Sequence, residues 1–233
     1  MTRQAVPVVT IDGPSGSGKG TIGRLLALKL GWHYLDSGAL YRLVALAGLS
    51  RRLDFADARA LAETAATLNA RFTPAAAGER VLLDGVDVSE ELRTERAGDA
   101  ASKVAAVPEV RAALLERQRD FAVPPGLVAD GRDMGTVVFP DALLKVVLTA
   151  SAEARAMRRH KQLKEKGIDV SLPDLSWDIA QRDARDATRT VAPFRPAPDA
   201  QTIDSTSLTP EEVVAHILSW LERVGVVAER AKG

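Results

Sequence analysis

The 233-residue chain has no cysteine, three histidines and one asparagine, Asn69. Because cysteine is absent, the chain has no disulfide, no thiolate zinc site and no cysteine nucleophile. Three histidines also argue against a histidine-rich metal site. Net charge is missing as well, since 31 basic residues balance 31 acidic ones. A protein that mainly coats nucleic acid or a membrane surface needs a basic excess, so we expect neither as a partner.

Long hydrophobic runs are equally absent. No apolar run approaches the roughly 20 residues that cross a bilayer, and the start of the chain, MTRQAVPVVTID, lacks the extended apolar stretch of a signal peptide. These absences predict a soluble cytoplasmic protein. Apolar residues nevertheless make up 46% of the chain, which is enough to form the core of one α/β domain.

Apolar strand candidates alternate with amphipathic helix candidates, which predicts a parallel sheet covered by helices. The expected strands are 7–12, 32–36, 126–130, 143–149 and 200–206, and the expected helices are 21–30, 37–49, 104–121, helices within 153–190, and 209–224. At the start of the last helix, Thr209 suits the N-cap, Pro210 the first turn and Glu212 the third position of a capping box.

The middle of the chain interrupts this alternation. An alanine-rich helix is expected at 57–70, followed by a turn-rich segment at 71–89 with a short β-like run at 81–83. We interpret residues from about 60 to 102 as a small insertion within a single domain that spans residues 1–233.

The sequence GPSGSGKGT follows the first predicted strand and precedes the first predicted helix. It contains the G-x-x-x-x-G-K spacing of a phosphate-binding loop. Glycines let backbone N–H groups crowd around phosphate oxygens, and the helix points its positive end at the same oxygens. The lysine can reach the β- and γ-phosphates of a nucleotide. The predicted ATP-binding residues are Gly13, Pro14, Ser15, Gly16, Ser17, Gly18, Lys19, Gly20 and Thr21.

One position departs from the usual phosphate loop. Gly20 follows the lysine, where a serine or threonine usually binds magnesium, and the hydroxyl comes one residue later, at Thr21. The sequence therefore leaves the magnesium ligands open. Phosphates and waters can hold the metal, with help from Thr21 or Ser17, or from Asp130 through a water.

Other classes of phosphate-loop protein fit less well. GTPases read guanine with Asn-Lys-x-Asp, but the single asparagine of this chain lies in NARF. A motor or transport ATPase usually places an acidic residue after an apolar strand. The strand GLVAD offers Asp130 for this role, but DGRDMG at 130–135 is unusual for such proteins. The form GKGT is typical of nucleoside monophosphate kinases.

Four further motifs resemble the bacterial cytidylate kinase family: LDSGALYR at 35–42, ASKVAAVPEVR at 101–111, DGRDMGTVVFPDA at 130–142 and QRDARDATR at 181–189. The resemblance covers nearly the whole chain, and DGRDMGTVVFPDA is its most specific part. It implies a three-layer phosphate-loop α/β fold with a central parallel sheet, an insertion that binds the acceptor nucleotide, and a helical lid at about 153–170.

The resemblance also implies an activity in pyrimidine nucleotide metabolism. ATP, with magnesium as cofactor, donates its γ-phosphate to CMP, giving CDP and ADP, with dCMP as a second acceptor and UMP as a poorer one. The transfer is expected to be in-line, without a covalent enzyme intermediate. The expected partners are small nucleotides alone, and the expected state is a monomer.

The family resemblance assigns the acceptor site to residues that suit a nucleotide. Arginine donates bidentate hydrogen bonds to phosphate, and aspartate can accept from the amino group of cytosine. The resemblance places Arg42 and Arg132 on the phosphate, Asp133 on the cytosine amino group and Arg111 on its O2 and N3 atoms. The full predicted CMP-binding set is Ser37, Arg42, Ser102, Arg111, Arg132, Asp133, Arg182, Asp186 and Arg189.

The last three of these residues are spaced so that a helix would carry them on one face, and the resemblance places Arg182 and Asp186 on the ribose. We interpret their neighbours Asp183 and Arg185 as a solvated ladder of ion pairs. In the lid, the resemblance suggests that Arg155, Arg158 and Arg159 close over the transferred phosphoryl group. The predicted catalytic residues are Lys19, Arg158 and Arg159.

Two alternatives remain open from the sequence. One is a kinase for another small acceptor, such as AMP or a hydroxylated metabolite. The other is a regulatory module that binds ATP and transfers nothing. Such a module would keep the phosphate loop but would have no need for two separate arginine-rich clusters.

Overall fold

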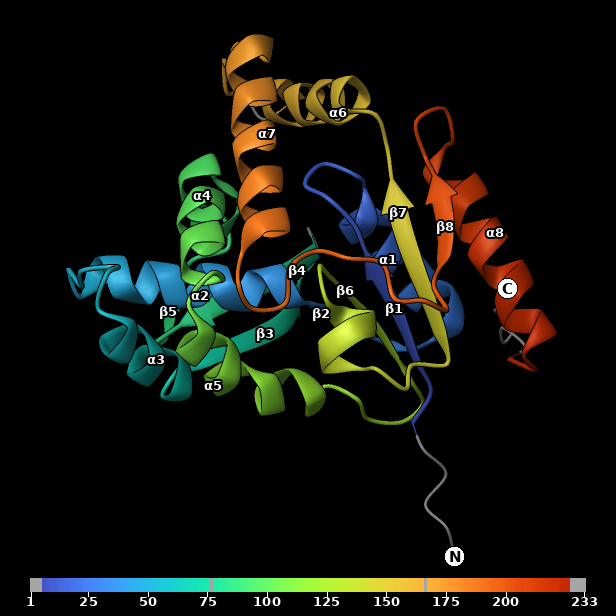
Figure 1. The fold of residues 1–233 in the computed structure, drawn as a ribbon, viewed down its shortest axis with the longest axis horizontal. Helices are drawn as coiled ribbons and strands as arrows, with labels where there is room; N and C mark the ends of the chain where they lie inside the picture. Colours follow the sequence, from blue (N-terminus) through green and yellow to red (C-terminus); the bar gives the residue numbers. More distant parts are fainter. Residues whose placement is uncertain (1–5, 76–77, 166, 227–233) are drawn as a thin grey trace, which may run out of the picture. The chain divides into compact units, whose positions relative to one another are not determined.

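The computed structural model describes residues 6–75, 78–165 and 167–226. The chain divides into two compact units (Figure 1). The first unit comprises Met1–Asp36 and Arg119–Gly233, and the second comprises Ser37–Gln118. No helix in the described parts of the chain is long and apolar enough to cross a membrane.

The first unit is built on a five-stranded sheet in the order β2-β6-β1-β7-β8, in which all neighbouring strands run parallel. Helices flank the sheet, which confirms the α/β fold with a central parallel sheet. The elements of this unit are β1 (Val8–Asp12), α1 (Lys19–Leu30), β2 (His33–Asp36), β6 (Leu127–Gly131), the short π-helix η2 (Met134–Val138), β7 (Leu144–Thr149), α6 (Ala152–Glu165), α7 (Leu172–Thr188), β8 (Gln201–Asp204) and α8 (Pro210–Arg223).

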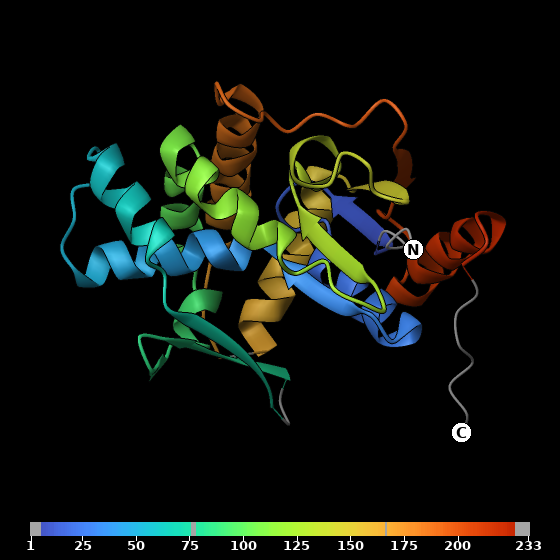
Figure 2. The ribbon, with the colours of Figure 1, turned by 90° about the horizontal axis from the view of Figure 1, so that it is seen from below.

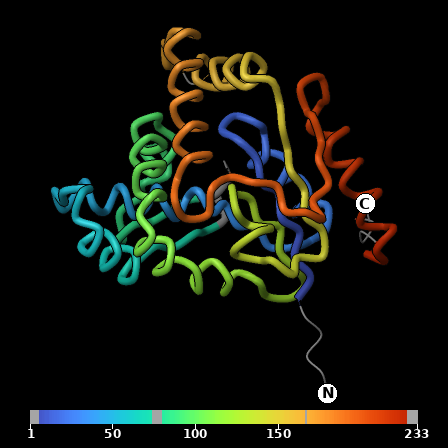
Figure 3. Tube along the Cα trace, viewed as in Figure 1, coloured from blue at the N-terminus to red at the C-terminus, as the bar shows by residue number. Residues whose placement is uncertain are grey.

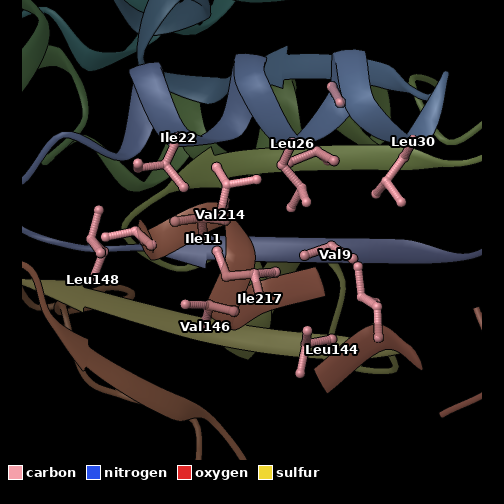
Figure 4. Packing of buried hydrophobic residues seen from close by; sticks show 14 of the residues in the cluster. Val9, Ile11, Ile22, Leu26, Leu30, Leu144, Val146, Leu148, Val214 and Ile217 are labelled. Atoms are coloured by element: carbon pink, nitrogen blue, oxygen red, sulfur yellow. The ribbon is translucent and has the colours of Figure 1, made fainter. Parts of the chain in front are cut away.

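The main core of this unit lies between one face of the sheet and the helices α1 and α8. Apolar residues three or four apart form one stripe on each helix, so a whole row of side chains reaches the sheet. Figure 4 shows Ile22, Leu26 and Leu30 of α1 pointing toward Val9 and Ile11 of β1. The buried stripe of α8 contains Val213, Val214, Ile217 and Leu221.

The start of α8 has the predicted capping box. The backbone N–H of Glu212 donates to the Thr209 hydroxyl, at 3.2 Å, and the backbone N–H of Thr209 donates to the Glu212 carboxylate, at 2.8 Å. Two N–H groups that the helix would leave without partners are thereby satisfied. The hydrogen bonds that the Thr209 N–H and then its hydroxyl donate to the Glu212 carboxylate also lower the pKa of Glu212, because they favour its charged form.

The second unit contains helices and a small antiparallel sheet in the order β3-β4-β5 (Figure 2). Asp84 and Gly85 both have positive φ angles, 50° and 84°, and they form the two-residue turn between β4 and β5. The elements are α2 (Ser37–Ser50), α3 (Ala58–Ala66), β3 (Ala70–Ala75), β4 (Gly78–Leu83), β5 (Val86–Asp87), the 3-10 helix η1 (Glu91–Arg93), α4 (Glu95–Val104) and α5 (Pro108–Arg119).

Two sequence predictions for this unit were wrong. The segment 71–89 was expected to be turn-rich around a short β-like run at 81–83; that run lies within β4, but β3 and β5 form there too, and Pro74 is accommodated because β3 is an edge strand. The helix expected at 104–121 begins later, because α5 starts at Pro108 and ends at Arg119, and α4, which ends at Val104, was not expected. Proline disfavours a helical conformation in the residue before it, but suits the first turn of a new helix.

Candidate functional site

The phosphate loop joins β1 to α1, as the blue part of the trace in Figure 3 shows. Three of its glycines are required by the backbone. A Cβ atom on Gly13 would lie 2.3 Å from the Leu148 carbonyl oxygen, and Gly16 and Gly18 have φ angles of 75° and 94°. Gly18 is the N-cap of α1, which begins at Lys19, two residues before the predicted start. The loop therefore presents backbone N–H groups at a helix N-terminus, as phosphate binding requires.

The lysine of the loop lies at the first position of α1. Its Nζ donates a hydrogen bond to the carbonyl oxygen of Pro14, at 3.2 Å, so the ammonium group folds back over the loop. A flexible cation held there can move to phosphate oxygens when a nucleotide is bound. The geometry suits the predicted role of Lys19.

Two arginines of α6 hold the backbone of the same loop. Arg155 Nη1 donates to the Ser15 carbonyl oxygen at 2.9 Å, and Arg158 Nη1 donates to the Ser17 carbonyl oxygen at 3.2 Å. Arg158 also donates to the Ser205 hydroxyl, at 3.1 Å, beyond the end of β8. In this structure Arg155 and Arg158 thus bind the loop itself. Arg159 donates to Gln162 on its own helix, at 3.3 Å.

Asp183 of α7 also reaches the phosphate loop. Its carboxylate lies 2.6 Å from Arg155 Nη1 and accepts a longer hydrogen bond from the backbone N–H of Ser15, at 3.4 Å. Its interpretation as part of a solvated ion-pair ladder was wrong. The contact could not be found from spacing along the helix, because Ser15 and Asp183 lie 168 residues apart.

A buried carboxylate faces the place where this loop lacks a side chain. A Cβ atom on Gly20 would lie 3.5 Å from Asp130 Oδ2, which accepts a 2.7 Å hydrogen bond from the Tyr34 hydroxyl. The tyrosine ring needs Gly23, where a Cβ would lie 2.7 Å from Tyr34 Cε2. Burial raises the pKa of Asp130 to about 6, and the carboxylate of Asp36 adds to this rise while Lys19 opposes it.

At this corner the protein supplies only some of the ligands that a bound cation would need. Within the described ranges, no group of three or more His, Cys, Asp or Glu side chains is arranged to hold a metal ion. Thr21 is exposed in the first turn of α1. The buried Ser17 side chain instead faces inward, and its Oγ lies 3.0 Å from the Cβ position of Gly13.

The predicted acceptor residues of the first unit form two charge pairs. Arg132, after β6, lies with its Nε 2.6 Å from Asp186 Oδ2 on α7. Asp133 Oδ1 lies 3.7 Å from Arg189 Nη2, and both side chains are at most 4% exposed. The predicted shared helix face was wrong for Arg189, which is the C-cap of α7 with extended backbone angles of −59° and 142°. Arg182 and Asp186 lie on the helix itself.

Asp12, which the sequence interpretation missed, anchors this acceptor loop. Its two carboxylate oxygens accept hydrogen bonds from the backbone N–H groups of Met134 and Gly135, each at 2.9 Å. Asp12 directly precedes the phosphate loop, and Met134 directly follows Asp133. The sequence did offer a signal for this role, because Asp12 is an acidic residue at the end of a buried strand, next to Gly13. Burial raises the pKa of Asp12 to about 6, although the two backbone hydrogen bonds oppose the rise.

The raised pKa of Asp12 predicts a pH dependence of stability. The folded chain binds the proton of this carboxyl more tightly than the unfolded chain, whose pKa is near 3.8. Its contribution to the unfolding free energy therefore falls as pH rises from 3.8 through about 6. Relative to an Asp12→Asn variant, we expect the wild-type chain to lose about 1 kcal/mol of stability between pH 5 and pH 7. Urea unfolding of both proteins across this range measures the difference, and parallel pH profiles would contradict it.

The remaining predicted acceptor residues belong to the second unit. Ser37 is the first residue of α2 and is 3% exposed. Arg42 lies one turn later on the same helix, and Ser102 lies on α4, which packs against α2. Arg111 of α5 donates to the Ala105 carbonyl oxygen at 3.2 Å, and its guanidinium lies 5.6 Å from the centre of the Tyr41 ring. These contacts restrain Arg111 in one orientation.

Residues 9–223 match the cytidylate kinase family. The chain belongs to the cytidylate kinase family. A cytidylate kinase of Aeromonas salmonicida (strain A449) is 56% identical over 220 residues, which cover 94% of this chain and 96% of that protein. A cytidylate kinase of Pseudomonas savastanoi pv. phaseolicola (strain 1448A / Race 6) is 57% identical over 222 residues, which cover 94% of this chain and 97% of that protein.

Membership of the cytidylate kinase family confirms the resemblance inferred from the four motifs. Within the first unit, the structure brings Lys19 together with the loop it serves, and it brings Arg132 and Asp133 together with Asp186 and Arg189. Three residues of this cytidylate kinase family member had roles that sequence reasoning missed. Asp12 accepts hydrogen bonds from the loop after β6, Tyr34 donates to Asp130, and Asp183 accepts from the phosphate loop.

Proposed function

We propose that this chain transfers the γ-phosphate of ATP to CMP, giving CDP and ADP, with dCMP as a second acceptor. The observation that carries the proposal is the pairing of two loops in a member of the cytidylate kinase family. The phosphate loop follows β1, and the loop with Arg132 and Asp133 follows the neighbouring strand β6. Ligands of open parallel sheets bind at this carboxyl edge of the strands.

For the donor nucleotide, the proposal assigns the phosphates to the backbone N–H groups from Gly13 to Thr21 and to the ammonium group of Lys19. The N-terminus of α1 favours negative charge at the same place. Lys19, Arg158 and Arg159 are proposed to neutralise the charge of the transferring group. Catalysis then consists of positioning and electrostatic stabilisation, without a covalent enzyme intermediate.

For the acceptor, the proposal assigns Asp133 to the amino group of cytosine and Arg132 to the phosphate. The proximity of Asp186 and Arg189 to these two side chains supports this assignment, because the four charges hold each other in place until a nucleotide competes for them. The other proposed contacts are Ser37, Arg42, Ser102, Arg111 and Arg182.

Magnesium is the proposed cofactor, bound mainly through phosphates and water. The residues fit an ion held through water, because Asp130 lies beside Gly20 and Thr21 adds a hydroxyl in the same helical turn. When bound, the ion would neutralise phosphate charge. We further propose that the protein is a cytoplasmic monomer with small nucleotides as its partners.

The test is ADP release from ATP and Mg²⁺ with CMP, dCMP, UMP, AMP or GMP as acceptor, each against a blank without acceptor. We expect turnover that strongly favours CMP and dCMP. Turnover that favours AMP would contradict the assigned base contacts while leaving a nucleotide kinase. ATP binding without turnover of any acceptor would contradict the proposed function and favour a binding module.

A further inference from the structure

Both backbone polar groups of Ser15, its N–H and its C=O, contact side chains of α6 and α7. Arg155 Nη1 donates to the Ser15 carbonyl oxygen at 2.9 Å, and the Ser15 N–H faces Asp183 Oδ1 at 3.4 Å. The ring of contacts closes between the two side chains, because the same Arg155 nitrogen lies 2.6 Å from Asp183 Oδ2. Arg155 is only 7% exposed. A hydrogen-bonded ion pair with one partner buried is costly to break from one side.

The next residue of the loop, Gly16, packs closely against the backbone of α6. Gly16 has a φ angle of 75°, and a Cβ atom there would lie 3.0 Å from Arg155 Cβ and 3.1 Å from the Arg155 carbonyl oxygen. The backbone of α6 therefore contacts the loop at Gly16, and the side chain of Arg155 reaches around it to Ser15 and Asp183. Asp183 keeps that side chain in its position. The loop at Ser15 and Gly16 thus takes its conformation from α6 and α7 as well as from its own glycines.

We propose that Asp183 is a positioning residue for the donor site: by holding Arg155 and the backbone N–H of Ser15, it sets the conformation in which the phosphate loop binds the phosphates of a nucleoside triphosphate. This inference rests on the proposed function and deepens it. Asp183 touches neither reacting group. It acts through Arg155 and through the loop backbone.

Charge and position predict opposite effects here, which makes the proposal testable. A carboxylate beside a triphosphate site repels the ligand, so charge alone predicts that ATP binds more tightly once Asp183 is neutralised. Positioning predicts weaker binding, because Arg155 and the backbone N–H of Ser15 both lose Asp183 as a partner. The sign of the change in ATP affinity therefore separates the two explanations.

The experiment compares Asp183→Ala and Asp183→Asn with Asp174→Asn in the full-length chain. Asp174 is an exposed aspartate in the first turn of the same helix, so its variant loses the same charge from α7. The dissociation constant of ATP is measured by equilibrium titration without acceptor, and KM for ATP and for CMP is measured in the coupled ADP assay. Thermal unfolding of each variant reports its folding.

We expect Asp183→Ala to raise the ATP dissociation constant about tenfold, which corresponds to about 1.4 kcal/mol. Asp183→Asn should raise the ATP dissociation constant by a smaller factor, because the amide oxygen of the asparagine can still accept a hydrogen bond. KM for CMP should stay within about twofold, and Asp174→Asn should match the wild type. Asp186, three residues along α7, pairs with Arg132, so a general displacement of α7 would raise KM for CMP too.

Equal or tighter ATP binding by Asp183→Ala and Asp183→Asn would overturn the proposal. So would equal losses for ATP and CMP that follow the loss of thermal stability, because they indicate a structural role alone. The titration needs no turnover. A wild-type chain that binds ATP but phosphorylates no nucleotide would therefore contradict the proposed function and still allow the role of Asp183 to be decided.

Discussion

Replacing Lys19 with alanine is expected to lower turnover with ATP and CMP by about three orders of magnitude, or about 4 kcal/mol of transition-state stabilisation. Lys19 lies at the first position of α1, directly after the N-cap Gly18, and its ammonium group already folds over the loop toward Pro14. As the flexible side-chain cation of the loop, it can follow the charge that moves from ATP to the acceptor. Backbone N–H groups cannot follow it in this way.

The fold should survive this change, because Lys19 is partly exposed and donates to the Pro14 carbonyl oxygen within the loop. Thermal unfolding within a few degrees of the wild type would confirm that. Lys29→Ala is the matched control, since it removes an exposed lysine from the last turn of the same helix. ADP release by the two variants is then compared. Turnover of Lys19→Ala at the level of Lys29→Ala would refute the assigned role of the loop.

A second large effect is expected at Asp133. In Asp133→Ala, kcat/KM for CMP should fall by about two orders of magnitude, far more than kcat/KM for ATP, because the proposed buried acceptor for the cytosine amino group is lost. Part of the loss is structural, because the buried Arg189 loses a partner that lies 3.7 Å away. For the alanine variant, kcat/KM must therefore be measured for both ATP and CMP. Equal decreases for the two nucleotides would indicate a structural role alone.

Asp133→Asn isolates the base contact. The asparagine amide can donate to the O4 acceptor of uracil, whereas the aspartate can only accept from the N4 donor of cytosine. We expect the ratio of kcat/KM for CMP to that for UMP to fall at least tenfold in this variant. Asp141→Asn, an exposed change in the same DGRDMGTVVFPDA motif, should leave the ratio unchanged. An unchanged ratio in Asp133→Asn would remove Asp133 from base recognition.

Much of this protein could be predicted from the sequence because the relevant signals are local. The phosphate loop depends on the spacing of Gly13, Gly18 and Lys19 between a strand and a helix, and the capping box of α8 depends on residues three apart. The strands of the parallel sheet are short apolar runs bounded by turn residues. In each case the residues that make the feature lie within a few positions of one another, so their spacing is visible in the chain.

Local signals were weaker where neighbouring segments compete. Residues 71–89 contain turn formers at Pro74, Gly78 and Gly85, yet three strands form there because each supplies backbone hydrogen-bond partners to the next. The helix expected from Val104 starts only at Pro108, because proline suits the first turn of a helix and disfavours a helical residue before it. For the three strands, propensity alone could not predict the outcome, because pairing with another segment decided it.

By itself, the sequence determined the phosphate loop, the strands of the parallel sheet and the motifs of the cytidylate kinase family. Only the tertiary structure decided what supports the two loops. Ser15 meets Asp183 across 168 residues, Met134 meets Asp12 across 122, and Tyr34 meets Asp130 across 96. These charged and polar groups are placed by the packing of strands and helices that are distant in the chain. No spacing along the chain encodes such contacts, because they exist only once the sheet has assembled.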